Sequence, residues 1–482
     1  MIYFLSLLPI IVLVALSLLR GVKEAVTVGW LVTTLLFFFW GADINQYLGA
    51  LGVSMLTTIN ILMIVLGAVF LYNIMQHTGM IEQISHSLDR LHPSKEIRFF
   101  LLALGLTAFF EGVAGFGTPG AIVPLILVAL GFGAILSVSV VLLFDGLVAL
   151  FGAVGTPVLT GLQVPLGLSE SQVYNIAITA ALLVALAGVL VLLLVFRMVT
   201  REHGLLEHRK EVLLLYTFFA VPFCFFAWLV PELATVLGSL TMLGLSVLYL
   251  GRGKRPVNLK PWLPYAVLAF LLLLPKLWEP LKGWIGMELV FPGMFGTTID
   301  GAIKPLQSPL LPFLVVGMGV AFFKKSESLY LGELLMKIGR VFVVLFPSVA
   351  IAQLMIHSGV TQPSMVRYIA ELMSSLGTAY VVVAPFIGVL GAFITGSTTI
   401  SNIVFGASQL ETAVALNIEP VTMLALQLSG ASMGNAICLF NIIAAASVAN
   451  IKEYRLILSN NMGPTLLATL LVGLLGMVLF FL

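Results

Sequence analysis

Two acidic residues, Glu111 and Asp145, lie within long apolar stretches of the sequence. A carboxylate in apolar surroundings is costly unless it takes up a proton, binds a cation or is hydrogen bonded. Both residues are therefore candidates to carry or coordinate a coupling cation. For Glu111 a structural role, as a helix cap or a partner for backbone N–H groups, is an equal alternative, whereas for Asp145 the functional interpretation is favoured.

Glu111 also opens a segment, EGVAGFGTPG (111–120), in which four glycines accompany a threonine and a proline. Glycine lets the backbone bend sharply and lets other groups approach it closely. We expect this segment to contact a substrate through Gly115, Gly117, Thr118 and Pro119.

A second polar segment, TGSTTISN (395–402), carries five hydroxyl groups and one amide within eight residues. N–H groups at the start of a helix bind carboxylates through hydrogen bonds and the helix dipole. Hydroxyl side chains can then contact the same anion, while the alternative is that they hold helices together. Here we favour a substrate site and expect its ligands to be Gly396, Ser397, Thr398, Thr399, Ser401 and Asn402. In GNAICLFN (434–441), Asn435 and Asn441 are further candidates, and a purely structural role is equally plausible for them.

The composition predicts which environment holds these residues. Of the 482 residues, 60% are hydrophobic and 9% are charged, whereas soluble domains carry about 25% charged residues. The mean hydropathy is +1.14. Charge-free runs long enough to cross a bilayer, or nearly so, occur at 2–19, 53–75, 173–196 and 462–482. The sequence therefore predicts an integral protein of the lipid bilayer.

Charge and cysteine content exclude several other classes of protein. The net charge of +2 is too small to indicate a nucleic-acid partner. Cys224 and Cys438 both lie in apolar stretches, so neither a disulfide framework nor a metal cluster is expected. An intramembrane enzyme would need a nucleophile with a base or a metal triad, and the chain has no HExxH motif, so we do not expect one. We expect no metal or cofactor apart from a coupling H⁺ or Na⁺.

Positive charges predict the topology. Short loops rich in Lys and Arg remain in the cytoplasm. Most of the 23 basic residues fall in six short segments, and placing all of them in the cytoplasm requires an even number of crossings between neighbours. The result is an all-α polytopic protein with about 12 transmembrane helices and both termini outside. The six segments are 20–23, 90–98, 197–210, 252–260, 324–340 and 452–455.

Two charge-free intervals, 112–144 and 372–410, are too long for a single crossing. Each contains or adjoins one of the polar glycine-containing segments. Non-helical backbone at membrane depth is tolerated only where protein buries it or where it lines a wet cavity. We therefore expect two re-entrant hairpins, with tips near 111–120 and 395–402.

The chain also contains an internal repeat. VFLYNIMQHTGM (69–80) resembles VAIAQLMIHSGV (349–360), and the polar segments follow in the same order in both halves. The first copy runs into a basic loop and the second leaves one, so the copies are inverted, which is typical of alternating-access transporters. The predicted organisation is N-terminal spans (1–52), repeat 1 (53–197), intervening scaffold spans that are a possible dimer surface (198–339) and repeat 2 (340–482).

Several of these segments resemble the lactate permease family. EGVAGFGTP (111–119) is similar to the family signature EGxAGFGTP, FGAVGTP (151–157) to its second glycine segment, and GSTTISN (396–402) with the following FGA to GSDTSSN…FGA. The departures are Thr398 in place of Asp, Ile400 in place of Ser, Asp145 in place of Asn, and Asn435 where some members carry Lys.

The resemblance implies a permease for small 2-hydroxy monocarboxylates, such as lactate or glycolate, that moves them with a cation, usually a proton. It also implies two hairpins, two interrupted helices and often a homodimer. A prokaryotic inner membrane is the expected location. We predict a cation-coupled secondary transporter of such a carboxylate, and the alternatives are a carrier of another small organic anion and a passive anion channel.

Overall fold

The computed structural model describes the chain except for residues 89–91, 93, 116, 205–207, 251–259, 279, 282–287, 304, 307, 327 and 482. The predicted cytoplasmic segment 252–260 therefore lies outside the described residues, apart from Lys260. In the described part, ten helices are long and apolar enough to cross a membrane, or up to 11 when a bent helix pair counts as one span. The prediction of an all-α, multi-pass membrane protein is confirmed.

The first three helices are α1 (Ile2–Leu19), α2 (Val22–Phe39) and α3 (Ile44–His77). A reciprocal cap starts α3: Asp43 accepts from the Gln46 N–H at 2.8 Å, and the Gln46 side chain accepts from the Asp43 N–H at 2.9 Å. Such a cap satisfies N–H groups that have no partner within the helix. It fixes the start of a 34-residue helix that is longer than a bilayer is thick.

A helical hairpin follows α3. Its first arm is continuous through three segments and ends at Val113, and its second arm, α7, folds back against the first. The turn between them lies in the predicted EGVAGFGTPG segment. The elements are α4 (Met80–Leu88), α5 (Lys95–Phe100), the π-helix η1 (Leu101–Leu106), α6 (Thr107–Val113) and α7 (Thr118–Ala129).

The next span is broken in the middle. Left-handed backbone at Ala153, Val154 and Gly155 interrupts it, with φ values of 43°, 55° and 74°. A long closing helix, α11 (Glu170–His203), comes after it. The broken span consists of α8 (Ala134–Val148), η2 (Ala149–Phe151), α9 (Gly152–Val158), the π-helix η3 (Leu159–Gln163) and α10 (Val164–Leu166).

The middle of the chain forms shorter elements. The charge pattern predicts two crossings between the basic segments 252–260 and 324–340, but the helices found there, α14 and α16, have 15 and 14 residues. Between them, two three-residue strands pair in an antiparallel manner, with Val290 opposite Ala302. The elements are α12 (Arg209–Leu229), η4 (Pro231–Leu233), α13 (Ala234–Leu250), η5 (Lys260–Trp262), α14 (Leu263–Leu277), β1 (Leu289–Phe291), η6 (Met294–Gly296), β2 (Gly301–Ile303) and α16 (Leu310–Phe323).

The last part of the chain contains the same kinds of element in the same order as the segment 44–203. A long helix is followed by a short one, a two-armed hairpin, a span broken by a 42° bend, and a long closing helix. These are α17 (Leu331–Ile356), α18 (Met365–Ser374), η7 (Gly377–Ala379), α19 (Tyr380–Thr395), α20 (Thr398–Ala415), α21 (Pro420–Gly434), η8 (Asn435–Ile437), α22 (Leu439–Val448) and α23 (Tyr454–Phe481).

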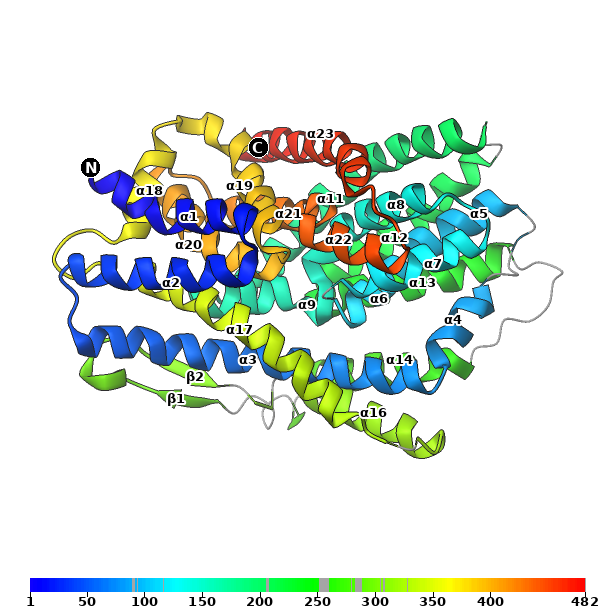
Figure 1. Ribbon diagram of the computed structural model, residues 1–482, viewed down its shortest axis with the longest axis horizontal. Coiled ribbons are helices and arrows are strands. Elements are labelled where there is room, and N and C mark those ends of the chain that lie inside the picture. Colours follow the sequence, from blue (N-terminus) through cyan, green and yellow to red (C-terminus); the bar gives the residue numbers. More distant parts are fainter. Residues whose placement is uncertain are drawn as a thin grey trace.

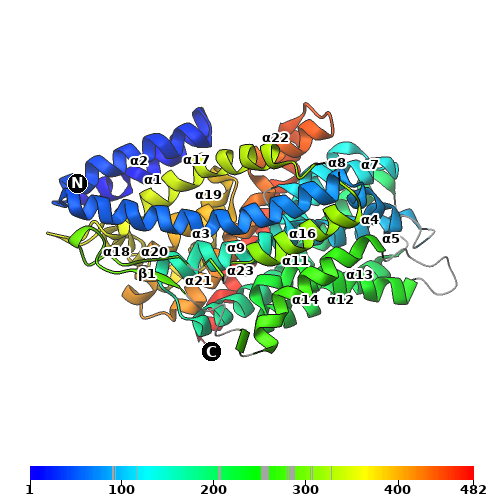
Figure 2. The ribbon, with the colours of Figure 1, turned by 90° about the horizontal axis from the view of Figure 1, so that it is seen from below.

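The two matching sets of elements approach the centre of the molecule from opposite ends. In Figures 1 and 2, α4, α5 and α7 lie towards the right, whereas α18 and α20 lie towards the left. The sets also exchange contacts: α7 packs on α22 of the other set, and α20 packs on α9 and η3. The two broken spans meet at their breaks, where α8 contacts η8 and α21 contacts η2.

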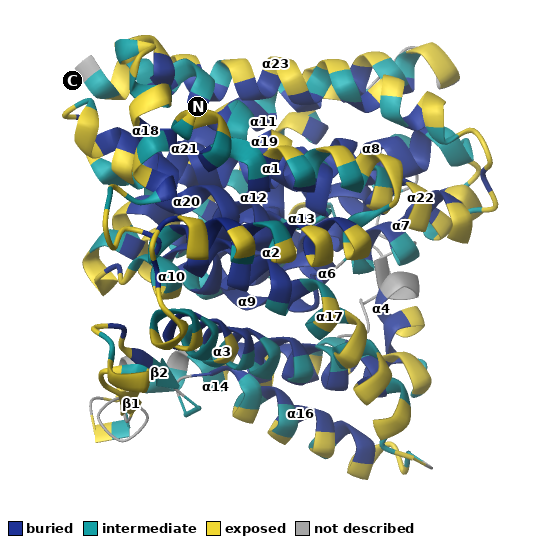
Figure 3. Cartoon of the chain, turned by 60° about the vertical axis from the view of Figure 1, so that its left-hand side comes forward, coloured by how far each residue is buried: buried dark blue, intermediate teal, exposed yellow. Residues whose placement is uncertain are grey.

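Burial separates the central elements from the outer ones. In the broken span Ala134–Leu166, 89% of the most apolar window is buried, compared with 22% in α1. Figure 3 shows the same contrast between the dark-blue centre around α20 and α21 and the exposed residues on α1, α2 and α16. The hairpins and broken spans therefore form a core that the outer helices surround.

Candidate functional site

The first hairpin turns through two glycines with left-handed backbone. Gly115 has φ of 58° and Gly117 has φ of 78°, a conformation that strains other residues. A β-carbon at Gly115 would lie 2.9 Å from Cβ of Ala153. The tip of the hairpin therefore packs directly against the break in α8–α9, and only glycine fits at that contact.

Glu111 and Asp145 meet beside this tip. Both side chains are buried, Glu111 on the last turns of α6 and Asp145 near the end of α8. Both side chains line the same small cavity, and the helices that carry them pack against each other, so the two carboxyl groups are neighbours. A β-carbon at Gly152 would overlap Oε1 of Glu111, so glycine leaves the space that this carboxyl occupies. Two carboxyl groups this close cannot both carry an uncompensated charge, so they share a proton or hold a cation.

The break after α8 is strained. Ala153 and Val154 are non-glycine residues in the left-handed region, and for a β-branched residue this conformation is rare. Contacts on both sides hold it: Thr235 donates to the carbonyl of Val148 at 2.9 Å, and Thr156 donates to the carbonyl of Ala153. Strained backbone that the surroundings fix in this way is typical of functional sites.

The second hairpin turns at Gly396, which has φ of 72°. Ser397 then caps α20, because its hydroxyl accepts from the Ile400 N–H at 3.3 Å. The N–H groups of Thr398 and Thr399 are among those with no acceptor inside the helix. The tip therefore presents backbone donors and the positive end of an 18-residue helix.

The break between α21 and α22 provides amide side chains. Asn435 donates through Nδ2 to Oγ1 of Thr398 at 3.0 Å, which joins the break to the start of α20. Asn441 donates to the backbone carbonyl of Asn435 at 3.4 Å. Ser432, one turn before the break, donates to the carbonyl of Gly146 on α8 at 2.8 Å. Both broken spans are thus fastened to each other where they cross.

All four elements enclose one cavity of about 40 Å³, which has room for a few water molecules at roughly 10–15 Å³ each. In the part of the chain that the structure describes, Oδ1 of Asp145 and Oδ1 of Asn435 are buried without a hydrogen-bond partner. Buried polar atoms normally have partners, so these two oxygens have unused capacity to bind a ligand. The cavity is lined by Glu111, Gly115, Gly117, Asp145, Ala149, Gly152, Ala153, Thr156, Pro157, Gly396, Ser397, Thr398, Thr399, Asn435 and Asn441.

Four of the predicted substrate ligands do not line this cavity. Thr118 and Pro119 begin α7 behind the first tip. Ser401 donates to the carbonyl of Gly388 on α19 at 2.9 Å, and Asn402 donates to the carbonyl of Pro157 at 3.1 Å. The side chains of Ser401 and Asn402 therefore hold α20 to its neighbours and do not line the cavity.

Apart from Asp145, the residues of the first broken span that line the cavity were not among the predicted ligands. Ala149, Gly152, Ala153, Thr156 and Pro157 all line the cavity. The signal that could have identified them is the segment GAVGTP (152–157), which repeats the Gly-Thr-Pro ending of the first hairpin tip. A buried network of Gln409, Gln427 and Tyr380 beside the second hairpin was also missed.

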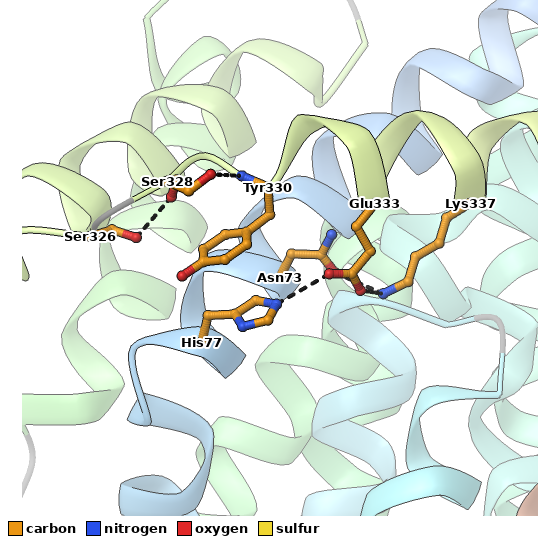
Figure 4. A network of polar contacts seen from close by, with 7 residues as sticks. All are labelled: Asn73, His77, Ser326, Ser328, Tyr330, Glu333 and Lys337. Carbon is orange, nitrogen blue, oxygen red and sulfur yellow. Dashed lines mark hydrogen bonds and ion pairs between the residues drawn. The ribbon is translucent and has the colours of Figure 1, made fainter.

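A separate charged cluster joins α3 to α17 away from this cavity. Nε2 of His77 lies 3.1 Å from Oε2 of Glu333, and Nζ of Lys337 lies 2.8 Å from Oε1 of the same carboxylate. The His77 ring stacks on Tyr330 at 3.8 Å between centroids, and Lys337 also donates to Asn73. Figure 4 shows the cluster between the end of one helix and the start of the other. It links two helices that hold matching places in the two sets of elements.

Comparison with known proteins gives consistent matches. A family model described as L-lactate permease matches residues 3–259 and 310–482. A putative L-lactate permease of Haemophilus influenzae is 26% identical over 94% of this chain and 93% of its own length. The L-lactate permease of Streptococcus iniae is 26% identical over 84% of this chain and 93% of its own length. That of Escherichia coli K12 is 36% identical over a shorter region, 21% of this chain and 18% of its own length.

Proposed function

Because the chain belongs to the L-lactate permease family, we propose that it is a secondary transporter of lactate or a closely related 2-hydroxy monocarboxylate. A coupling cation, H⁺ or Na⁺, moves with the anion. The central cavity is the transport site. The observation that carries the proposal is that one cavity combines a helix N-terminus suited to an anion with a pair of carboxyl groups suited to a cation.

The substrate carboxylate binds at the start of α20. Free N–H groups and the helix dipole attract anions at such a terminus. Ser397, Thr398 and Thr399 add hydroxyl groups around it. Gly396 provides the tight turn into this terminus, since its left-handed φ of 72° would strain other residues.

Glu111 and Asp145 carry the coupling cation. Their proximity requires a proton or a metal cation between them, and the cavity places this positive charge close to the bound anion. The unpartnered Oδ1 of Asp145 offers a further ligand atom. Binding of the cation to Glu111 and Asp145 therefore increases the affinity for the anion. Release of the cation or of the anion lowers the affinity for the other.

Transport proceeds by alternating access between two inverted units, 53–197 and 340–482. The matching order of elements, their approach from opposite ends and the exchange of contacts between them support this proposal. Inverted units that meet at broken helices near the midplane are typical of such carriers. Residues 1–52 and 198–339 form the scaffold, and both termini face the outside of a prokaryotic inner membrane.

Uptake into proteoliposomes tests this function. We expect L-lactate to accumulate above its external concentration when an inward H⁺ or Na⁺ gradient is imposed. Empty liposomes under the same gradients are the control. A passive anion channel would let lactate equilibrate in the protein-containing vesicles without accumulation, and no uptake at all would exclude lactate as a substrate.

A further inference from the structure

Asn435 lines the central cavity and has a buried polar atom that no described protein group satisfies. The residue is 7% exposed, and its Oδ1 has no hydrogen-bond partner among the described residues. A buried acceptor without a partner costs free energy. An amide oxygen in this position is therefore suited to accept a hydrogen bond from something that enters the cavity.

Neighbouring hydrogen bonds determine how the Asn435 amide is oriented. Nδ2 donates to Oγ1 of Thr398 at 3.0 Å. The Thr398 hydroxyl uses its own proton on the carbonyl of Ala431, at 3.4 Å, so towards Asn435 it can only accept. The NH₂ group must therefore face Thr398. The oxygen of the side-chain amide is left without a partner. Asn441 donates to the backbone carbonyl of Asn435.

The free oxygen lies next to the proposed carboxylate site. Thr398 is the first residue of α20, so Asn435 is one hydrogen bond away from the N–H groups that would hold the anion. In a 2-hydroxy acid, the hydroxyl is carried by the carbon bonded to the carboxylate. A carboxylate bound at the α20 terminus therefore places its 2-hydroxyl group beside the Asn435 amide, which is hydrogen bonded to Thr398.

The chemistry of an amide oxygen fits this position better than that of a carboxylate. Oδ1 of Asn435 is neutral, so it accepts a hydroxyl proton without repelling the substrate carboxylate. Asp145 also lines the cavity and has an unpartnered Oδ1, but it shares the cavity with a second carboxyl group, that of Glu111. We assign Oδ1 of Asp145 to the coupling cation and Oδ1 of Asn435 to the hydroxyl group of the substrate.

We propose that Asn435 is the specificity-determining residue for 2-hydroxy acids, and that its Oδ1 accepts the proton of the substrate 2-hydroxyl. This inference rests on the proposed function and states how that site selects its substrate. Monocarboxylates without a hydroxyl at carbon 2 leave the buried oxygen unpaired when they bind. Sites that hydrogen-bond a substrate hydroxyl reject analogues that lack it.

Equilibrium binding to the purified chain in detergent micelles tests the proposal by titration calorimetry. The ligands are L-lactate, propionate, which lacks the hydroxyl, and 3-hydroxypropionate, an isomer of lactate with the hydroxyl one carbon further away. We expect the unmodified chain to bind L-lactate roughly tenfold or more tightly than either analogue. This comparison needs no substitution, so it decides the question even if a variant does not fold.

Asn435→Ala should bring the affinities for the three ligands to within about threefold of one another, mainly by weakening L-lactate binding. Asn461→Ala is the matched control. Asn461 is also a buried asparagine with an unpartnered Oδ1 among the described residues, and it donates to the carbonyl of Ala436 at 2.8 Å, but it does not line the cavity. This variant should keep the preference of the unmodified chain.

Equal binding of L-lactate and propionate by the unmodified chain would overturn the inference while leaving the proposed function intact. An unchanged preference in Asn435→Ala would also overturn it. If neither L-lactate nor the analogues bound, the proposed function itself would fail, and the inference with it.

Discussion

At the scale of single residues, neighbours along the chain have different tasks. Thr398 and Thr399 line the cavity, whereas Ser401 and Asn402, one turn further along α20, hold that helix to its surroundings. Asn402 donates to the carbonyl of Pro157 at 3.1 Å and accepts from Gln427 at 3.4 Å. We infer that Asn402 positions the second hairpin against the first broken span.

Asn402→Ala should therefore lower stability more than it changes the site. We expect a loss of about 1–3 kcal/mol, because the substitution leaves the buried carbonyl of Pro157 without its side-chain donor. Thermal unfolding in detergent measures this loss, and L-lactate binding should stay within about threefold of the unmodified value. Asn45→Ala, at an exposed position on α3, is the control and should leave the melting temperature unchanged. A large loss of affinity with normal stability would instead place Asn402 in the substrate site.

At the scale of elements, close approach between helices depends on glycine. A β-carbon at Gly430 of α21 would overlap the carbonyl oxygen of Pro385 on α19, and one at Gly388 would overlap the backbone of α21. These contacts bring a hairpin arm and a broken span together without intervening side chains. Small residues at such interfaces are typical of helix packing in membranes.

Gly430→Ala should force α19 and α21 apart and destabilise the protein by more than about 2 kcal/mol, since inserted methyl groups in a packed interior are poorly tolerated. Fluorescence-detected size-exclusion chromatography after heating measures the effect. Gly463→Ala on α23 is the matched control, because a β-carbon there meets nothing within 4 Å among the described atoms. Equal melting of both variants would show that the α19–α21 contact is not tight.

The positions of the two turns could be predicted from the sequence, because glycines and polar residues stand out in an apolar chain. The first hairpin turns between Val113 and Thr118 and the second at Gly396, within the expected segments. Which side chains face the cavity could not be predicted, because that depends on how each helix is rotated against its neighbours. For this reason Ser401 was expected in the cavity and Gly152 was not.

At the scale of the whole molecule, the two sets of elements form one core within outer helices. The exposed faces of α1 and α2 and the buried central spans indicate which parts face lipid (Figure 3). The lengths of α14 and α16 could not be predicted, because apolar composition alone does not show where a helix ends. The orientation of the units in a membrane is the property on which alternating access depends.

Cysteine labelling tests this orientation. Single cysteines at Ser94, before the first hairpin, and at Thr361, before α18, should react with a membrane-impermeant maleimide from opposite sides of the membrane. Ser94 directly precedes α5 and Thr361 lies shortly before α18, and Figure 1 shows these two helices at opposite ends of the molecule. The unmodified chain is the control for Cys224 and Cys438. Labelling of both positions from the same side would contradict the inverted arrangement.

The most direct test of the account is the effect of Glu111→Gln and Asp145→Asn on two activities of the same proteoliposomes. Gradient-driven accumulation of L-lactate requires the coupling cation, whereas exchange of labelled for unlabelled lactate requires only the anion site. Glu419→Gln, which removes an exposed carboxylate at the start of α21, is the matched control. We predict that both variants lose accumulation at least tenfold yet retain exchange, and that the control keeps both. Full accumulation in both variants would contradict a coupling role for the Glu111–Asp145 pair.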